Sequence, residues 1–131
     1  MKKIFSITVC LSILTFPQNG VHKKYYNSGE VQLEKTYRNG KLNGLYREFY
    51  KSGELKGEWI YVDDKLSGVG KTFFKSGQLE SMADFKDDKE NGYVKEYYKN
   101  GQLKREMKYV NGKYAHERRE FYANGWIRRE E

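Results

Sequence analysis

Apolar and charged residues alternate along much of this chain with a period of two. Leu103, Met107 and Tyr109 are separated only by charged residues, and residues 55–62 follow a similar pattern. A period of two with many aromatic residues is typical of a half-buried β-strand. A second, shorter strand is predicted at residues 45–50. Because glycine recurs between these stretches, long helices are disfavoured, and we predict an all-β protein.

This alternation belongs to a repeat of 24 residues. A fixed period of this size is the signature of a repeat protein, in which each unit packs on its neighbours. The register places a half repeat at 19–25, complete copies at 26–49, 50–73, 74–97 and 98–121, and a partial copy at 122–131. One column is always glycine, at Gly29, Gly53, Gly77, Gly101 and Gly125.

Each repeat contains two turns, which divide it into two strands. Lys-Ser-Gly at residues 51–53 has the form of a three-residue hairpin loop with a left-handed glycine. Asn-Gly at residues 39–40 and 111–112 is typical of a two-residue hairpin turn. Asp-Asp takes its place at residues 63–64 and 87–88. We therefore predict stacked β-hairpins.

Strand pairing follows from the turns. Around the loop at residues 51–53, we expect Phe49 opposite Leu55 and Leu45 opposite Trp59. This pairing would place the odd-numbered residues of both strands on one face of the sheet.

The two-residue Asn-Gly turn brings odd-numbered positions opposite even-numbered ones. One extra residue beyond the turn is needed to return the odd-numbered residues to their face by Leu45. A bulge at residues 43–44 supplies that residue most simply. Gly68 and Gly92 recur at the bulge position, whereas His116 breaks the series. A three-residue loop at residues 39–41 would restore the pairing equally well.

The first 18 residues have the pattern of a secretory signal peptide. Lys2 and Lys3 precede an apolar run over residues 4–16, which is too short to span a bilayer as a helix. We predict cleavage near residue 18 and an extracytoplasmic location, periplasmic or secreted. Cleavage also removes Cys10, which we do not interpret as a lipidation site because Val9 precedes it.

Composition and charge argue against several functions. Loss of Lys2 and Lys3 lowers the formal charge from +7 to +5, from 23 basic and 18 acidic residues, which is a poor match to nucleic acid. One cysteine and two histidines provide no zinc-finger ligand set. His22 and His116 lie in different repeats, and no catalytic, cofactor or metal motif accompanies them. Although the Asp-Asp pairs resemble calcium ligands, turn chemistry accounts for them. We therefore predict a non-enzymatic protein without cofactor.

The repeat resembles the variant MORN repeat. Its pattern is aromatic-x-Ser/Asn-Gly-x-Leu, followed by Tyr-x-Asn/Asp-Gly/Asp-Lys-x-x-Gly, and Gly-Glu-Trp at residues 57–59 is similar to the core of the standard MORN repeat. Asp64 and Asp88 depart from the turn glycine, as His116 departs from the later one. The resemblance covers about residues 19–131 and extends to proteins grouped as the YwqK-type antitoxin family. It implies an elongated, single-layer antiparallel sheet of stacked β-hairpins that binds partners and has no catalytic centre.

Two columns of the repeat are candidate partner-binding ladders. One is basic in every repeat and is expected on the face that carries Leu55, with members about 9.5 Å apart. The other is aromatic, and because an aromatic residue precedes each member, both faces should carry aromatic rows. The alternatives are a solvated basic row and tyrosines that only stiffen neighbouring strands. The candidates are Lys23, Arg47, Lys71, Lys95 and Arg119, with Tyr50, Phe74, Tyr98 and Tyr122.

Three functions fit these observations. The first is a secreted or periplasmic module that binds a protein partner. The second is an antitoxin or immunity protein that neutralises a toxin, and the third is a scaffold at a phospholipid membrane surface, to which MORN-repeat proteins are also linked. The two open edges of such a sheet also allow edge-to-edge self-association.

Overall fold

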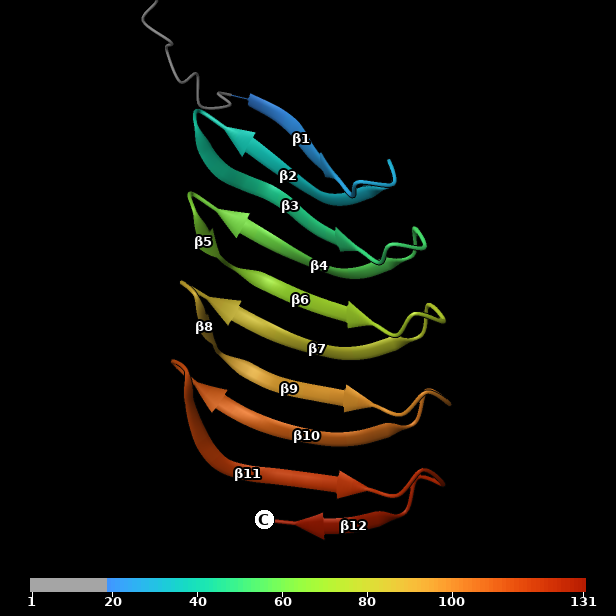
Figure 1. Cartoon of the computed structure of the whole chain (residues 1–131). Coiled ribbons are helices and arrows are strands. Elements are labelled where there is room, and N and C mark those ends of the chain that lie inside the picture. The colour runs from blue at the N-terminus through green and yellow to red at the C-terminus, as the bar shows by residue number, and fades with distance from the viewer. Residues whose placement is uncertain (1–18) are drawn as a thin grey trace, which may run out of the picture.

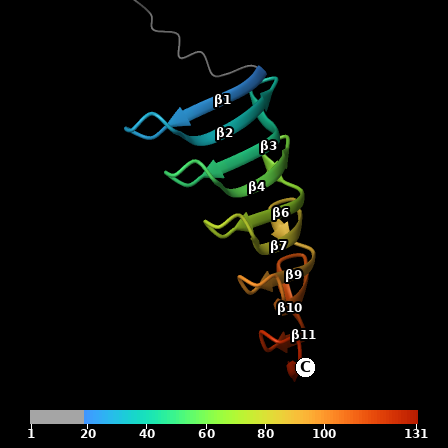
Figure 2. The same ribbon diagram turned by 90° about the vertical axis from the view of Figure 1, so that its right-hand side faces the viewer.

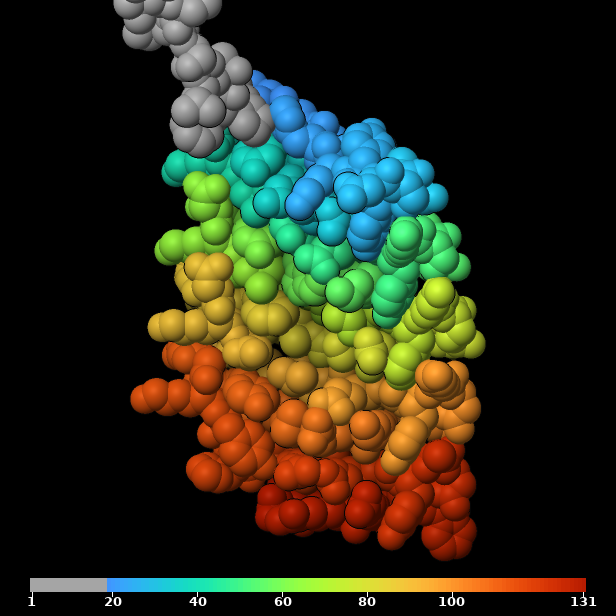
Figure 3. Space-filling view, viewed as in Figure 1, coloured from blue at the N-terminus to red at the C-terminus, as the bar shows by residue number. Residues whose placement is uncertain are grey.

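The computed structural model describes residues 19–131, which form one twelve-stranded antiparallel sheet without helices (Figure 1). The predicted signal peptide at residues 1–18 lies outside the described residues. Successive hairpins stack in chain order, as the colour bands of the surface show (Figure 3). The predicted fold, an elongated single-layer sheet of stacked hairpins, is confirmed. The strands are β1 Asn19–Tyr25, β2 Val31–Arg38, β3 Lys41–Phe49, β4 Leu55–Val62, β5 Lys65–Leu66, β6 Gly68–Phe73, β7 Leu79–Lys86, β8 Lys89–Glu90, β9 Gly92–Tyr97, β10 Leu103–Val110, β11 Lys113–Phe121 and β12 Ile127–Glu130.

The sheet is a single twisted layer. Seen from the side, the hairpins turn progressively from β1 to β12 (Figure 2), as the right-handed twist of strands requires. No second layer covers either face, and no hydrophobic side chain of residues 19–131 is fully buried. Stability therefore comes from half-buried side chains that pack beside one another along the sheet, and from the strand pairing itself.

The two-residue turns lie together along one side of the sheet (Figure 1). Arg38 pairs with Lys41 around the first of them, which confirms the two-residue turn and excludes the three-residue alternative. Asn39 and Gly40 have φ values of 51° and 75°, since a type I′ turn needs positive φ at both central residues. The Asp-Asp pair at residues 63–64 takes the same conformation, with φ values of 48° and 69°.

A bulge follows each of these turns, at the predicted position but with a different size. Tyr37 pairs with Leu42, whereas Lys35 pairs with Tyr46. Residues 43–45 therefore face Thr36 alone, so the strand carries two extra residues. The expectation of one extra residue was wrong. Two extra residues leave the alternation of faces unchanged, because the side-chain period of a strand is two.

His116 does not break the series of bulges. Met107 pairs with Arg118 and Tyr109 with Tyr114, so β11 carries the same two extra residues. His116 adopts a φ of 58° in the place of the bulge glycine. A left-handed conformation is costly for most side chains, but the repeat imposes it here, and the expectation based on the missing glycine was wrong.

The three-residue loops occupy the opposite side of the sheet from the Asn-Gly and Asp-Asp turns (Figure 1). The Gly53 N–H donates a hydrogen bond of 2.9 Å to the Tyr50 carbonyl, and Gly53 has a φ of 97°. Phe49 pairs with Leu55 across this loop, as predicted.

The pairing beyond that loop corrects the prediction for the faces. Glu48 pairs with Gly57, so Lys56 is an extra residue in β4. Trp59 consequently pairs with Tyr46 and not with Leu45. Because this single-residue bulge reverses the alternation, Leu55 and Trp59 lie on opposite faces. The expected run of odd residues on one face was therefore wrong from Lys56 onward.

Directly paired residues share a face of the sheet, and the pairings define two faces of different character. The aromatic face carries Tyr37, Tyr46, Trp59, Tyr61, Phe85 and Tyr109. The ion-pair face carries a row that crosses the sheet through one residue of each paired strand: Lys23, Glu34, Arg47, Glu58, Lys71, Met82, Lys95, Glu106, Arg119 and Glu130.

Candidate functional site

The predicted basic column lies on the face that also carries Leu55, as expected. It does not lie alone, because an acidic column of the same 24-residue period runs between its members. The acidic residues are Glu34, Glu58, Glu106 and Glu130. The sequence contains this column, and a register test of every position in the repeat would have found it.

Three carboxylates of the acidic column, those of Glu34, Glu58 and Glu106, lie near two basic residues each. The Glu34 carboxylate lies 2.9 Å from the Lys23 Nζ and 3.7 Å from an Arg47 nitrogen. The hydrogen bond that the Lys23 ammonium donates to Glu34 raises the pKa of Lys23. Glu58 similarly lies 3.6 Å from Arg47 and 3.9 Å from Lys71. The basic column is therefore largely neutralised within the sheet.

Glu106 is the most enclosed member of the row. Its exposed fraction is 6%, and it is the one charged residue of the described chain that is buried. Its carboxylate pairs with Arg119 and lies 3.9 Å from the Lys95 Nζ. Two cations therefore compensate the cost of removing this carboxylate from water.

Exposed apolar side chains lie beside the charged row. Leu45 and Ile60 pair with each other and are 38% and 40% exposed. Val62 lies two places beyond Ile60 on the same face, and Tyr93 is exposed at the column position of Leu45. Apolar area flanked by charge is typical of a surface that meets a partner.

The aromatic face is more closely packed. Tyr46 contacts Trp59 and Tyr61, with ring centroids 5.7 and 5.6 Å apart. The indole of Trp59 lies against two buried glycines: an ideal Cβ at Gly57 would be 2.4 Å from the indole Cη2, and one at Gly70 would be 2.6 Å from Cδ1. These glycines make room for the indole. The closely packed side chains that serve as the core of the sheet therefore lie on the aromatic face.

Burial in this cluster predicts a loss of stability at alkaline pH. Desolvation and the neighbouring Glu48 raise the pKa of Tyr46 to about 12. The unfolded chain loses the phenol proton near its ordinary pKa of about 10, before the folded chain does. Stability should therefore fall as the pH rises from 10 towards 12. Urea unfolding at about pH 9 and about pH 11 should show this fall, and Tyr46→Phe should make it smaller. An equal fall in the variant would contradict this role of Tyr46.

The candidate aromatic column links successive three-residue loops along one side of the sheet. The Tyr50 hydroxyl donates a 2.9 Å hydrogen bond to the Phe73 carbonyl, which lies at the end of the same repeat, just before the next loop. Tyr26 and Tyr98 make the corresponding bonds. Phe74 cannot, because it lacks the hydroxyl, while Tyr122 is 52% exposed. The hydroxyls of Tyr50 and Tyr98 thus have a structural role.

Phe74→Tyr should add the missing hydrogen bond. The new hydroxyl would reach the Tyr97 carbonyl, at the spacing that joins Tyr50 to Phe73. Phe74 lines an open hollow of 360 Å³. The free energy of unfolding should rise by about 1 kcal/mol, and Tyr50→Phe should lower it by a similar amount. Chemical denaturation measures both, and a Phe74→Tyr variant less stable than the parent would contradict the role assigned to this column.

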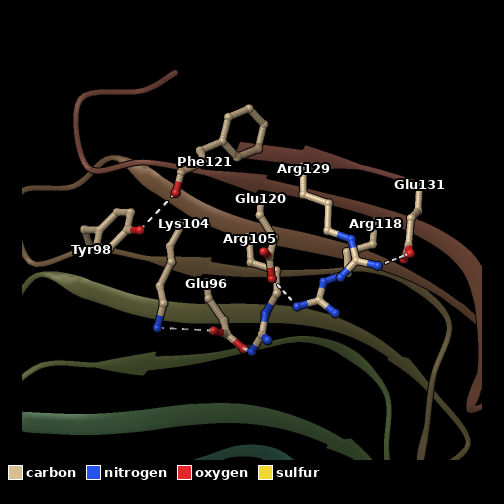
Figure 4. A network of polar contacts seen from close by, with 9 residues as sticks. All are labelled: Glu96, Tyr98, Lys104, Arg105, Arg118, Glu120, Phe121, Arg129 and Glu131. Atoms are coloured by element: carbon tan, nitrogen blue, oxygen red, sulfur yellow. Dashed lines mark hydrogen bonds and ion pairs between the residues drawn. The ribbon is translucent and has the colours of Figure 1, made fainter. Parts of the chain in front are cut away.

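A network of polar contacts extends over the last repeats of the aromatic face (Figure 4). Arg105 pairs with Glu96, and the Lys104 Nζ lies 3.9 Å from the same carboxylate. Arg118 pairs with Glu120, and the hydrogen bond between them lowers the pKa of Glu120. The guanidinium groups therefore have carboxylate partners within the chain.

The aspartates once compared with calcium ligands hold the repeats together. The Asp64 carboxylate accepts a 2.8 Å hydrogen bond from the Leu42 N–H, and the Asp64 N–H donates to the Leu42 carbonyl. Asp88 binds Leu66 in the same way. Among residues 19–131 no group of three or more His, Cys, Asp or Glu side chains is arranged to hold a metal ion.

Comparison with known families gives the class of the protein. The family model of the MORN repeat variant matches residues 18–39, 42–63, 66–87 and 90–111, segments that begin 24 residues apart. The chain therefore belongs to the MORN repeat variant family. A search of curated proteins found no match. The part of the chain that the structure describes contains no helix that could cross a membrane.

Proposed function

We propose that this chain is a non-enzymatic, extracytoplasmic module that binds a protein partner through the ion-pair face. The observation that carries the proposal is the distribution of exposed apolar side chains. Leu45, Ile60 and Tyr93 lie beside the charged row, whereas the aromatic face uses its rings to pack on one another. A partner can gain apolar contact on the ion-pair face without unfolding any part of the sheet.

The charged row supports the same proposal. Its outward side chains remain partly exposed, with Lys71 and Lys95 at 40% and 37%. Alternating charges at fixed spacing favour a partner with a complementary pattern and disfavour others. A toxin that this protein neutralises is one such partner, as the antitoxin grouping of similar proteins suggests. An anionic membrane surface is a weaker match, because acidic residues neutralise most of the basic column.

The test is recovery of a partner from the extracytoplasmic fraction with the purified chain as bait. Lys71→Glu/Lys95→Glu should lose that partner, because it reverses two charges of the row. Lys51→Glu/Lys75→Glu is the matched control, since it makes the same change of net charge in the exposed loops. Retention by the first variant, or equal loss by both, would contradict binding through the ion-pair face. Growth protection against a recovered toxin would then identify an antitoxin.

A further inference from the structure

One position interrupts the alternation of charges on the ion-pair face. Met82 of β7 pairs with Lys71 on one side and with Lys95 on the other. It stands at the column position of Glu34, Glu58 and Glu106. Two lysines therefore flank a thioether at the one place in the row where a carboxylate is replaced.

The two lysines share their carboxylates with other cations. Lys71 lies 3.9 Å from Glu58, which also pairs with Arg47. Lys95 lies 3.9 Å from Glu106, which also pairs with Arg119. Each of the two lysines thus has one carboxylate of the row on one side and the neutral Met82 on the other, so the row lacks one negative charge at this place.

Asp84 does not supply the carboxylate that is missing between Lys71 and Lys95. It lies two residues along β7 on the same face, and its carboxylate is directed at the bulge glycine, since an ideal Cβ at Gly92 would be 2.8 Å from its Oδ2. Within the described chain, the ion pairs of Lys71 and Lys95 go to Glu58 and Glu106. The side of each lysine that faces Met82 has no carboxylate partner in that part of the chain.

We infer that a partner inserts an acidic side chain over Met82, between Lys71 and Lys95. The inference rests on the proposed function and gives it a location. The row itself shows that the geometry accepts a carboxylate, because Glu34 bridges Lys23 and Arg47 at 2.9 and 3.7 Å from the same relative position. Met82, whose Sδ accepts a 3.6 Å hydrogen bond from the Tyr97 hydroxyl, provides an adaptable floor, and the partner's carboxylate completes the alternation.

The direct test uses a hexaglutamate peptide and the Met methyl groups as reporters. Met82 and Met107 are the two methionines of the repeats, and Met107 pairs with Arg118 on the aromatic face. In NMR spectra of the chain labelled with ¹³C at the methionine methyls, hexaglutamate should shift the Met82 signal and leave that of Met107 unchanged. Equal movement of both signals, or an equal effect of hexaglutamine, would overturn the inference.

Met82→Glu provides a second test, because the new glutamate side chain should itself occupy the site between Lys71 and Lys95. This variant should fold, since glutamate stands at this position in the three other complete repeats, and its affinity for hexaglutamate should fall about tenfold. Met82→Gln is the matched neutral control and should bind within about twofold of the parent. Unchanged affinity of Met82→Glu would overturn the inference.

Two further outcomes separate this inference from its alternatives. If phosphatidylserine vesicles shift the Met82 signal and hexaglutamate does not, the site binds a membrane surface and the inference is wrong. If Met82→Glu still captures the protein partner that Lys71→Glu/Lys95→Glu loses, the inference is wrong and the proposed function stands. Loss of that partner by Met82→Glu and retention by Met82→Gln is the result expected.

Discussion

Gly70→Val is expected to lower the free energy of unfolding by about 3 kcal/mol, because it overfills the tight packing around the Trp59 indole. A Cβ at Gly70 would lie 2.6 Å from Trp59 Cδ1 and 2.9 Å from Phe85 Cε2. Both are atoms of rigid rings, so the backbone would have to move. Urea unfolding followed by circular dichroism measures the change.

The next repeat provides a matched control for this prediction. Val94 and Ala83 stand one period after Gly70 and Trp59, so valine is accepted at this column where the neighbouring ring is absent. Strand propensity alone would make Gly70→Val stabilising. Trp59→Ala/Gly70→Val should be more stable than the sum of the two single changes predicts. A stabilising Gly70→Val would show that the indole does not limit this position.

Glu106→Gln should lower the free energy of unfolding by about 2 kcal/mol, since it removes the charge that compensates two cations. Glu106 is buried between Arg119 and Lys95, so its carboxylate cannot readily exchange these partners for water. The same substitution at Glu130, which is exposed in the partial repeat, should change stability by less than about 0.5 kcal/mol. Equal effects at the two positions would contradict the special role of Glu106.

The repeat period and the positions of the turns were predictable from sequence because both are local. Asn39-Gly40 requires positive φ at two residues, and few other residue pairs meet that requirement. The loop that ends at Gly53 was predictable for the same reason.

The faces were not predictable, because they depend on the single-residue bulge at Lys56, which no local signal marks. Lys56 is an extra residue in β4 and reverses the alternation between Leu55 and Trp59. The bulge beyond the Asn-Gly turn has two extra residues instead of one. Each bulge is set by how two strands fit across the sheet, and His116 shows that the fit prevails over the missing glycine.

The candidate site was predicted in part. The basic column was visible because each of its members is Lys or Arg, whereas the acidic column was hidden by Met82, which breaks it. Because acidic residues alternate with the basic residues along the row, the basic column is largely neutralised. The exception is the position of Met82, where the carboxylate is missing. The hydroxyl bonds of Tyr50 and Tyr98 depend on the distance between adjacent hairpins, which the stacking determines.

Site-specific photo-crosslinking tests most directly whether the ion-pair face meets the partner. A benzophenone amino acid would replace Ile60, which is 40% exposed on the ion-pair face, or Lys35, which lies over the Tyr46 ring on the aromatic face. In cells that contain the partner, irradiation should join it to the chain through position 60 and not through position 35. Crosslinks from position 35 alone would contradict the account and place the partner on the aromatic face.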